Sequence, residues 1–258
     1  MLKQKFDSVP WTIQQTFNGI FFTLVPWIAF TALSTFLGGN TNTVDTSSRP
    51  LALQVDVSNA IVTLIFSLIV YSAFLIAPFY YARRARKEPE HDQRSVWDLL
   101  GFRRFTIGTT ALLVLGFLVL IVLLNQAYSF LITTFHLHLQ TNDQLILHRA
   151  RIAPITTYVS LFTAVCVAPF CEEVFFRSFS FMGLKNGMQL WVAVVMSALI
   201  FGVAHGDPAS FPVLFCIGVA LALLRLWTGS YWPGFFLHFL NNGLSAVLII
   251  LALHGLNG

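Results

Sequence analysis

Long apolar runs separated by short polar loops make up almost the whole chain. About 20 predominantly apolar residues suffice for an α-helix to cross the hydrocarbon core of a bilayer. The pattern therefore predicts about seven membrane-spanning helices and no soluble domain. The predicted spans are residues 16–37, 57–82, 107–135, 154–183, 189–205, 210–227 and 231–253. The first run also resembles a signal peptide, but G-G-N-T-N-T after it is a poor cleavage site, so we interpret it as an anchor.

Composition supports this interpretation. The chain is 56% hydrophobic and only 10% charged, with a mean hydropathy of +0.74, whereas soluble domains carry roughly 25% charged residues. We therefore predict an all-α fold, a polytopic transmembrane helical bundle whose surroundings are the lipid bilayer. The net charge of +4 is modest and concentrated in one loop, which argues against a nucleic-acid partner.

The basic residues predict the orientation. Seven of the fifteen lysines and arginines lie in the loop 83–104, which we expect to be cytoplasmic. The N-terminus is then cytoplasmic and the C-terminus lies outside. Arg149 and Arg151, in an opposite loop, argue weakly against this assignment.

The adjacent glutamates Glu172 and Glu173 lie inside the fourth predicted span. A carboxylate at this depth costs several kcal/mol unless it is paired, protonated or facing a wet cavity, so such residues are functional candidates. Glu173 and Arg177 are four residues apart and share a helix face, which favours a structural ion pair. Glu172 lies about 100° round the helix and has no assigned counter-charge.

Two histidines follow on later spans. His205 ends the string F-G-V-A-H, and His238 lies one turn before Asn242. Taken alone, His205 is typical of an interfacial residue, and His238 with Asn242 is typical of hydrogen bonding between helices. Their depths nevertheless allow both histidines to meet Glu172 near the midplane. Pro169 favours this, because it removes a backbone donor and frees a carbonyl.

The three motifs E-E-x-x-x-R, F-x-x-x-H and H-x-x-x-N, in this order, resemble the CAAX prenyl protease type II and bacteriocin-processing (CPBP, also called Abi) family of intramembrane proteases. The resemblance covers about residues 169–242, and the string S-V-W-D-L-L-G-F-R at 95–103 also looks like a loop of that family. It implies hydrolysis of a peptide bond in a membrane-associated protein or peptide substrate. The residues that match the motifs are Glu172, Glu173, Arg177, Phe201, His205, His238 and Asn242.

The chemistry of these residues suits that reaction. Glu172 would act as the general base, and His205 would hold the attacking water. His238 and Asn242 would donate to the developing oxyanion. Glu173 with Arg177 would position Glu172, and Phe201 would support His205.

Metal dependence stays open at this point. Glu172, His205 and His238 also form a possible His₂Glu zinc site, although the H-E-x-x-H signature is absent. We favour a metal-free arrangement slightly, because amides such as that of Asn242 are poor zinc ligands and suit a donor role.

The organisation follows from the same resemblance. We expect N-terminal membrane helices and a basic loop in residues 1–106, and a CPBP-like catalytic core in 107–258, in a bacterial plasma membrane. The alternative is a protein without catalysis: a bacteriocin-immunity factor, a scaffold or a polar-lined transporter that uses the same polar groups.

Overall fold

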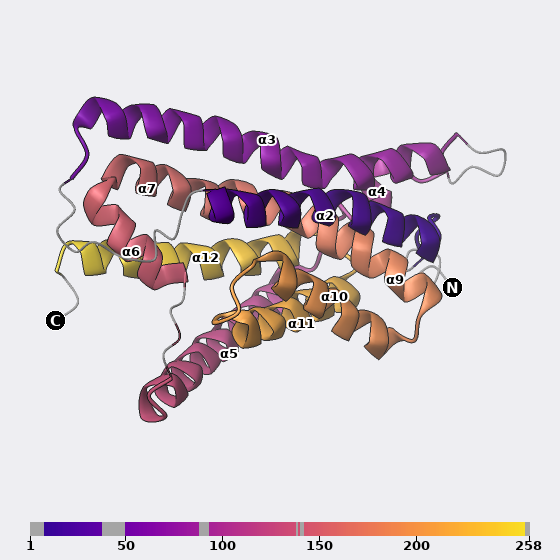
Figure 1. The fold of residues 1–258 in the computed structure, drawn as a ribbon. Coiled ribbons are helices and arrows are strands. Elements are labelled where there is room, and N and C mark those ends of the chain that lie inside the picture. Colours follow the sequence, from indigo (N-terminus) through magenta and orange to yellow (C-terminus); the bar gives the residue numbers. More distant parts are fainter. Residues whose placement is uncertain (1–7, 38–49, 88–92, 138, 140–141, 256–258) are drawn as a thin grey trace.

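The structure is a computed structural model, which describes residues 8–37, 50–87, 93–137, 139 and 142–255. The regular elements in these ranges are all helices (Figure 1). In chain order they are α2 (Ile13–Leu37), α3 (Leu53–Ala85), α4 (Val96–Leu99), α5 (Ile107–Thr134), α6 (Asn142–Ile152), α7 (Pro154–Phe162), η1 (Thr163–Val167), α8 (Ala168–Glu172), η2 (Glu173–Phe181), α9 (Met182–Gly187), α10 (Leu190–Ala204), α11 (Phe211–Thr228) and α12 (Trp232–Leu253). The segments η1 and η2 are π-helical, and α7 to α9 join through them into one continuous rod, called here the central helix.

The membrane-spanning pattern predicted from the sequence is confirmed. Five described helices are long and apolar enough to cross a membrane: α3, α5, the central helix, α11 and α12. Helix α10 is apolar but shorter, at 15 residues, and α2 spans 25 residues. These helices coincide with the seven predicted runs, so the chain is an all-α integral membrane bundle.

Two short helices lie where the hydrophobic pattern predicted only loops. Helix α4 is capped by Ser95, whose hydroxyl accepts from the backbone of Asp98 while the Asp98 carboxylate accepts from the backbone of Ser95. This reciprocal capping box satisfies donors that a helix start leaves open. Helix α6 joins α5 to the central helix, and Arg149 and Arg151 lie in its last turn. Neither helix is long enough to change the number of spans.

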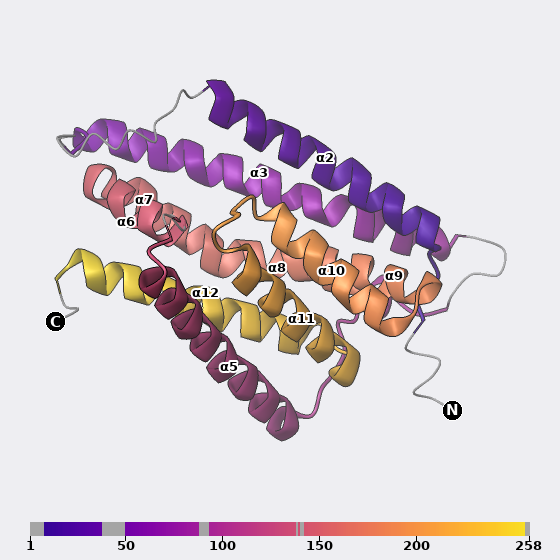
Figure 2. The same cartoon turned by 60° about the horizontal axis from the view of Figure 1, so that its bottom comes forward.

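The central helix runs between α3 and α12 (Figures 1 and 2). Asp56 of α3 bonds to Thr156 near the start of the central helix. Tyr81 of α3 stacks on Phe179 near its other end, with ring centres 5.6 Å apart. The partners differ by 100 and 98 in residue number, so α3 and the central helix run parallel with a nearly constant offset.

Asp56 fixes the start of the central helix. Its two carboxylate oxygens accept from the backbone of Ile155 at 2.9 Å and of Thr156 at 3.0 Å, and from the Thr156 hydroxyl at 2.6 Å. A carboxylate at a helix N-terminus satisfies open donors and stabilises the helix dipole. The sequence placed this acid at the edge of a span, and the structure shows that it ties α3 to the central helix.

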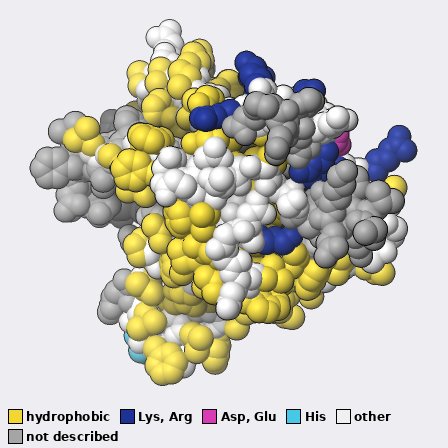
Figure 3. Space-filling view, turned by 90° about the vertical axis from the view of Figure 1, so that its right-hand side faces the viewer, with side chains coloured by type: hydrophobic (Ala, Val, Ile, Leu, Met, Phe, Trp, Pro, Cys, Tyr) yellow, Lys and Arg dark blue, Asp and Glu magenta, His cyan; other side chains and the backbone are white. Residues whose placement is uncertain are grey.

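Basic side chains gather at the end of the bundle where α3 finishes (Figure 3). The last turn of α3 carries Arg83 and Arg84, and hydrophobic side chains cover the flanks in the same view. Arg151 lies near the other end, where the backbone of Leu51 donates to the carbonyl of Ile152. This separation agrees with the predicted topology, but the side of the membrane on which each end lies stays a prediction, as does the division of the chain at 106/107.

Candidate active site

The glutamate pair lies where an α-helical turn separates two π-helical segments of the central helix. π-Helical segments are rare in proteins, and those that occur often lie at functional sites. In η1 the backbone of Ala168 donates to the carbonyl of Thr163, five residues back. The same register would pair residue 169 with Ala164, but Pro169 has no N–H. The side-chain amide of Asn242 donates to the Ala164 carbonyl instead, at 2.9 Å. The carbonyl that was expected to lose its backbone partner through Pro169 is therefore that of Ala164, and Asn242 of α12 supplies its hydrogen bond.

Glu172 faces two histidines from two other helices. Its Oε2 lies 3.8 Å from Nε2 of His205, just after α10, and 3.8 Å from Nε2 of His238 on α12. Both separations exceed the 2.7–3.2 Å of a direct N–H···O hydrogen bond. The three groups predicted to meet deep in the membrane do meet, and they leave a short gap between carboxylate and rings.

Their partners determine which ring nitrogens of the neutral histidines face Glu172. Nδ1 of His205 lies 2.7 Å from the carbonyl oxygen of Phe201. Nδ1 of His238 lies 3.2 Å from Oε1 of Glu173. Carbonyl and carboxylate oxygens accept, so each Nδ1 carries the hydrogen and each neutral ring presents an Nε2 lone pair. An ionised Glu172 opposite two lone pairs requires a proton donor or a cation between them.

Glu173 and Arg177 form a buried ion pair behind this cluster. Oε2 of Glu173 lies 3.7 Å from Nε of Arg177, and both side chains are 1% exposed. The Arg177 guanidinium also lies 4.5 Å from the ring centre of Phe201, within the range of a cation–π interaction. Phe201 thus contacts Arg177 with its ring and His205 with its carbonyl. The two residues predicted as structural support, Arg177 and Phe201, contact one another.

The cluster is most accessible on the His205 side. The side chain of His205 is 27% exposed, whereas that of His238 is 3% exposed. The chain on both sides of His205 is held by other helices: Trp27 of α2 donates to the carbonyl of Ala204, and the Tyr128 hydroxyl of α5 donates to that of Ala209. A substrate or water would therefore reach Glu172 most directly past His205.

Asn242 lies apart from the other predicted site residues. Its amide is bonded to Ala164, eight positions before Glu172 in the sequence, or about 12 Å along a helix axis. One of the two amide hydrogens is used in this bond, and the second is left for another acceptor. The contacts of Asn242 assign it a part in shaping the central helix, and its oxyanion role stays a prediction.

Tyr71 of α3 is a polar group that sequence reasoning missed. With the offset of about 100 between the two parallel helices, Tyr71 lies nearly level with Glu172. The ring is half-buried and packs 6.4 Å from that of Phe74. Only the long-range register of two helices places Tyr71 here, and no local pattern in the sequence carries that register.

Gly234 is a second missed position. A Cβ built on it would lie 2.7 Å from Oε2 of Glu173, closer than real Cβ atoms approach other atoms. Gly234 lies one turn before His238 on α12. The backbone of Gly234 therefore lies against Glu173, and the imidazole of His238 faces both Glu172 and Glu173. A glycine four residues before a site histidine was the available signal, but glycines are too common in membrane helices for it to be specific.

A family model described as type II CAAX prenyl endopeptidase Rce1-like matches residues 154–244. The match begins with the central helix and ends in α12, so it includes every residue of the three motifs. The resemblance to CAAX proteases drawn from the sequence is therefore confirmed.

Individual relatives agree with the family. The membrane-embedded CAAX protease MroQ of Staphylococcus aureus (strain USA300) is 29% identical over 161 residues, which is 60% of this chain and 58% of MroQ. The putative membrane peptidase YdiL of Bacillus subtilis (strain 168) is 30% identical over 101 residues, 39% of this chain and 40% of YdiL. The chain thus spans less than two thirds of the length of these relatives. No solved structure matches it.

Proposed function

We propose that this chain is an intramembrane endopeptidase of CAAX type, which hydrolyses a peptide bond of a membrane-associated protein or peptide in a bacterial plasma membrane. The observation that carries the proposal is the meeting of Glu172 with His205 and His238 inside an apolar bundle, each Nε2 lying 3.8 Å from the same carboxylate oxygen. The family match and the similarity to the membrane-embedded CAAX protease MroQ and the putative membrane peptidase YdiL support the reaction class.

The first step is the activation of water. The Nε2 lone pair of His205 and the carboxylate of Glu172 are both acceptors, so a water between them donates one hydrogen to each. The oxygen lone pair of this water then points away from both groups, toward a bound peptide. As the oxygen bonds to the carbonyl carbon, its proton passes to Glu172, which is the general-base role. Glu172 returns the proton to the nitrogen of the leaving amine when the carbon–nitrogen bond breaks.

Glu173 and His238 supply the electrostatic part. His238 also has a second form, in which Nε2 carries a proton while Glu173 accepts from Nδ1. In this form the ring would present an N–H on the side of Glu172, where the oxyanion develops. Loss of one such donor typically lowers the rate by about 10²–10³. Arg177 offsets part of the charge of Glu173, so the buried group as a whole is not strongly charged. Asn242 would add its second amide hydrogen if the substrate reaches that far along α12.

Tyr71 completes the polar surroundings from α3. We expect its hydroxyl to hydrogen-bond the bound substrate beside the scissile bond, since it lies level with Glu172. Hydrogen bonds of this kind contribute about 1 kcal/mol, or about five-fold in affinity.

A zinc-dependent version of the same site is the second candidate. Histidines that bind metals usually donate their other ring nitrogen to a carbonyl or carboxylate, and both histidines here do so. Against it, the H-E-x-x-H signature is absent from the sequence. Glu172, His205 and His238 would hold the ion, which would supply Lewis-acid chemistry. We keep the metal-free arrangement as the first proposal.

One experiment tests the reaction and its residues together. Membranes from cells that express wild-type protein or Glu172→Gln are compared by mass spectrometry of membrane-proximal peptides. We expect cleavage products with the wild type and at least about 10³-fold less with the variant, because the base is lost. Cys171→Ser, a neighbouring change that removes no proposed catalytic group, is the control. Identical peptides from both glutamate and glutamine forms would favour the non-catalytic alternatives of immunity factor, scaffold or transporter.

Metal content separates the two versions of the mechanism. In the metal-free version, chelators leave cleavage nearly unchanged and purified protein carries no stoichiometric zinc. Stoichiometric zinc in the wild type that is lost in His205→Ala would select the zinc-dependent version instead.

A further inference from the structure

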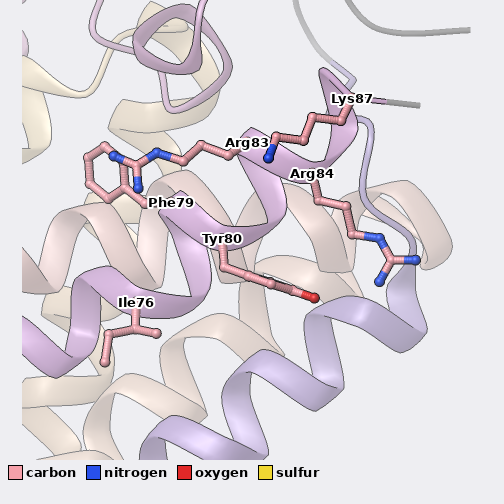
Figure 4. A pocket seen from close by; sticks show the side chains of 6 residues that line it. All are labelled: Ile76, Phe79, Tyr80, Arg83, Arg84 and Lys87. Atoms are coloured by element: carbon pink, nitrogen blue, oxygen red, sulfur yellow. The ribbon is translucent and has the colours of Figure 1, made fainter. Parts of the chain in front are cut away.

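A pocket lies on the outer surface of α3 near its C-terminal end, away from the proposed active site (Figure 4). Its volume is about 510 Å³, within the roughly 300–1,000 Å³ that is typical of small-molecule sites. The residues that line it are Ile76, Phe79, Tyr80, Arg83, Arg84 and Lys87. The described residues of its lining thus come from a single stretch of helix, the point at which α3 leaves the apolar region.

The lining residues form one stripe along the helix. Ile76, Tyr80, Arg83 and Lys87 follow one another at intervals of three or four residues, which places them on the same face. The stripe is apolar toward the middle of the helix and basic toward its end, as Figure 4 shows. Ile76 is 69% exposed and Tyr80 55% exposed, so this face of α3 is turned away from the bundle.

The basic end of the pocket is suited to a phosphate group. Arg83 lies across the ring of Phe79, with 5.7 Å between the guanidinium carbon and the ring centre, and this contact holds it over the pocket. Within the described residues, neither Arg83 nor Lys87 forms an ion pair with an acidic side chain. A guanidinium binds phosphate through two parallel hydrogen bonds, and an ammonium adds a point charge.

We propose that this pocket binds an anionic phospholipid. The phosphate of the headgroup lies between Arg83 and Lys87, with Arg84 at the rim, and an acyl chain follows Ile76 and Tyr80 toward the middle of the membrane. A lipid is the occupant that fits, because the apolar and the basic parts of the stripe succeed one another along the membrane normal as they do in a phospholipid. Basic residues at this depth each attract anionic lipid by about 1 kcal/mol. The proposal is independent of peptidase activity.

Thermal unfolding of the purified full-length protein in detergent tests the proposal. Dioleoyl-phosphatidylglycerol, dioleoyl-phosphatidylcholine and glycerol 1-phosphate are titrated separately, and the midpoint temperature is measured. We expect phosphatidylglycerol to raise the midpoint at concentrations where the other two compounds do not. In the double variant Arg83→Gln/Lys87→Gln, the concentration for half of the effect should rise about thirty-fold, the equivalent of about 1 kcal/mol for each basic residue.

Two further variants separate a specific site from general attraction to charge. Arg86→Gln removes one charge from the same helix end but from a residue that does not line the pocket, and we expect the wild-type response. The exchange Arg83→Lys/Lys87→Arg keeps both charges and should keep most of the response, even if the double glutamine variant folds poorly. An equal loss in Arg86→Gln, an equal effect of phosphatidylcholine, or full stabilisation by glycerol 1-phosphate alone would overturn the assignment to an anionic phospholipid.

Discussion

Replacement of Arg177 by alanine tests whether the buried ion pair supports the site. The guanidinium is 1% exposed, lies 3.7 Å from Glu173 and stands 4.5 Å from the ring centre of Phe201. Removing one partner of a buried pair typically costs about 3–5 kcal/mol, because the remaining charge stays buried. Glu173 keeps a second partner in His238 at 3.2 Å, which favours the lower end of that range. Loss of the cation–π contact adds about 1–2 kcal/mol.

We therefore expect Arg177→Ala to destabilise the protein by about 3–5 kcal/mol. For a chain of this size, 1 kcal/mol corresponds to about 2–4 °C, so the midpoint of thermal unfolding in detergent should fall by roughly 6–20 °C. Activity should fall as well, since Glu173 would no longer be fixed behind His238. Arg149→Ala, at an exposed arginine of α6, is the matched control and should leave both quantities unchanged.

A double variant separates charge from shape. Glu173→Gln/Arg177→Met removes both charges, so no unpaired charge stays buried, and it should recover much of the stability that Arg177→Ala loses. It should not recover activity, because a neutral amide holds His238 less firmly than a carboxylate. An unfolding midpoint of Arg177→Ala equal to that of the wild type, or a double variant less stable than the single one, would contradict the reasoning.

Three other changes test the geometry around the site and the topology. Gly234→Ala should lower activity strongly, because the new Cβ would lie 2.7 Å from Oε2 of Glu173 and must displace it; activity equal to wild type would refute the close approach. Tyr71→Phe should raise KM about five-fold through the loss of one hydrogen bond, whereas Tyr81→Phe, ten residues along the same helix, should not; equal effects would count against the role of Tyr71. A reporter fused after Arg86 should be cytoplasmic and one at the C-terminus external; both reporters on one side would exclude seven spans.

The spans were predictable because hydrophobic length alone selects them. The fourth predicted run ended at residue 183, and the central helix ends at Gly187. Helices α4 and α6 were not predicted, because they are short and carry polar residues, as loops commonly do. Helix α4 depends on the capping box between Ser95 and Asp98, a detail that hydrophobic periodicity does not report.

The candidate site was predictable where its residues are unusual for their surroundings. Glu172 and His238 stood out because charged and ionisable groups are costly in lipid. Tyr71 and Gly234 were not predictable in this way, since a tyrosine and a glycine are ordinary in a membrane helix. Their positions depend on how α3 and α12 align with the central helix, which is a tertiary property.

The arrangement explains why two adjacent glutamates are compatible with one site. Neighbouring side chains on a helix point about 100° apart, so Glu172 and Glu173 cannot both bind the same atom of a partner residue. His238 resolves this by using both ring nitrogens, Nδ1 toward Glu173 at 3.2 Å and Nε2 toward Glu172 at 3.8 Å. The buried glutamate thereby fixes the ring, while the more exposed one faces the gap beside His205. The pair thus divides into a carboxylate that orients and a carboxylate that is left to react, and α12 comes close to the orienting one, since a Cβ at Gly234 would lie 2.7 Å from Oε2 of Glu173.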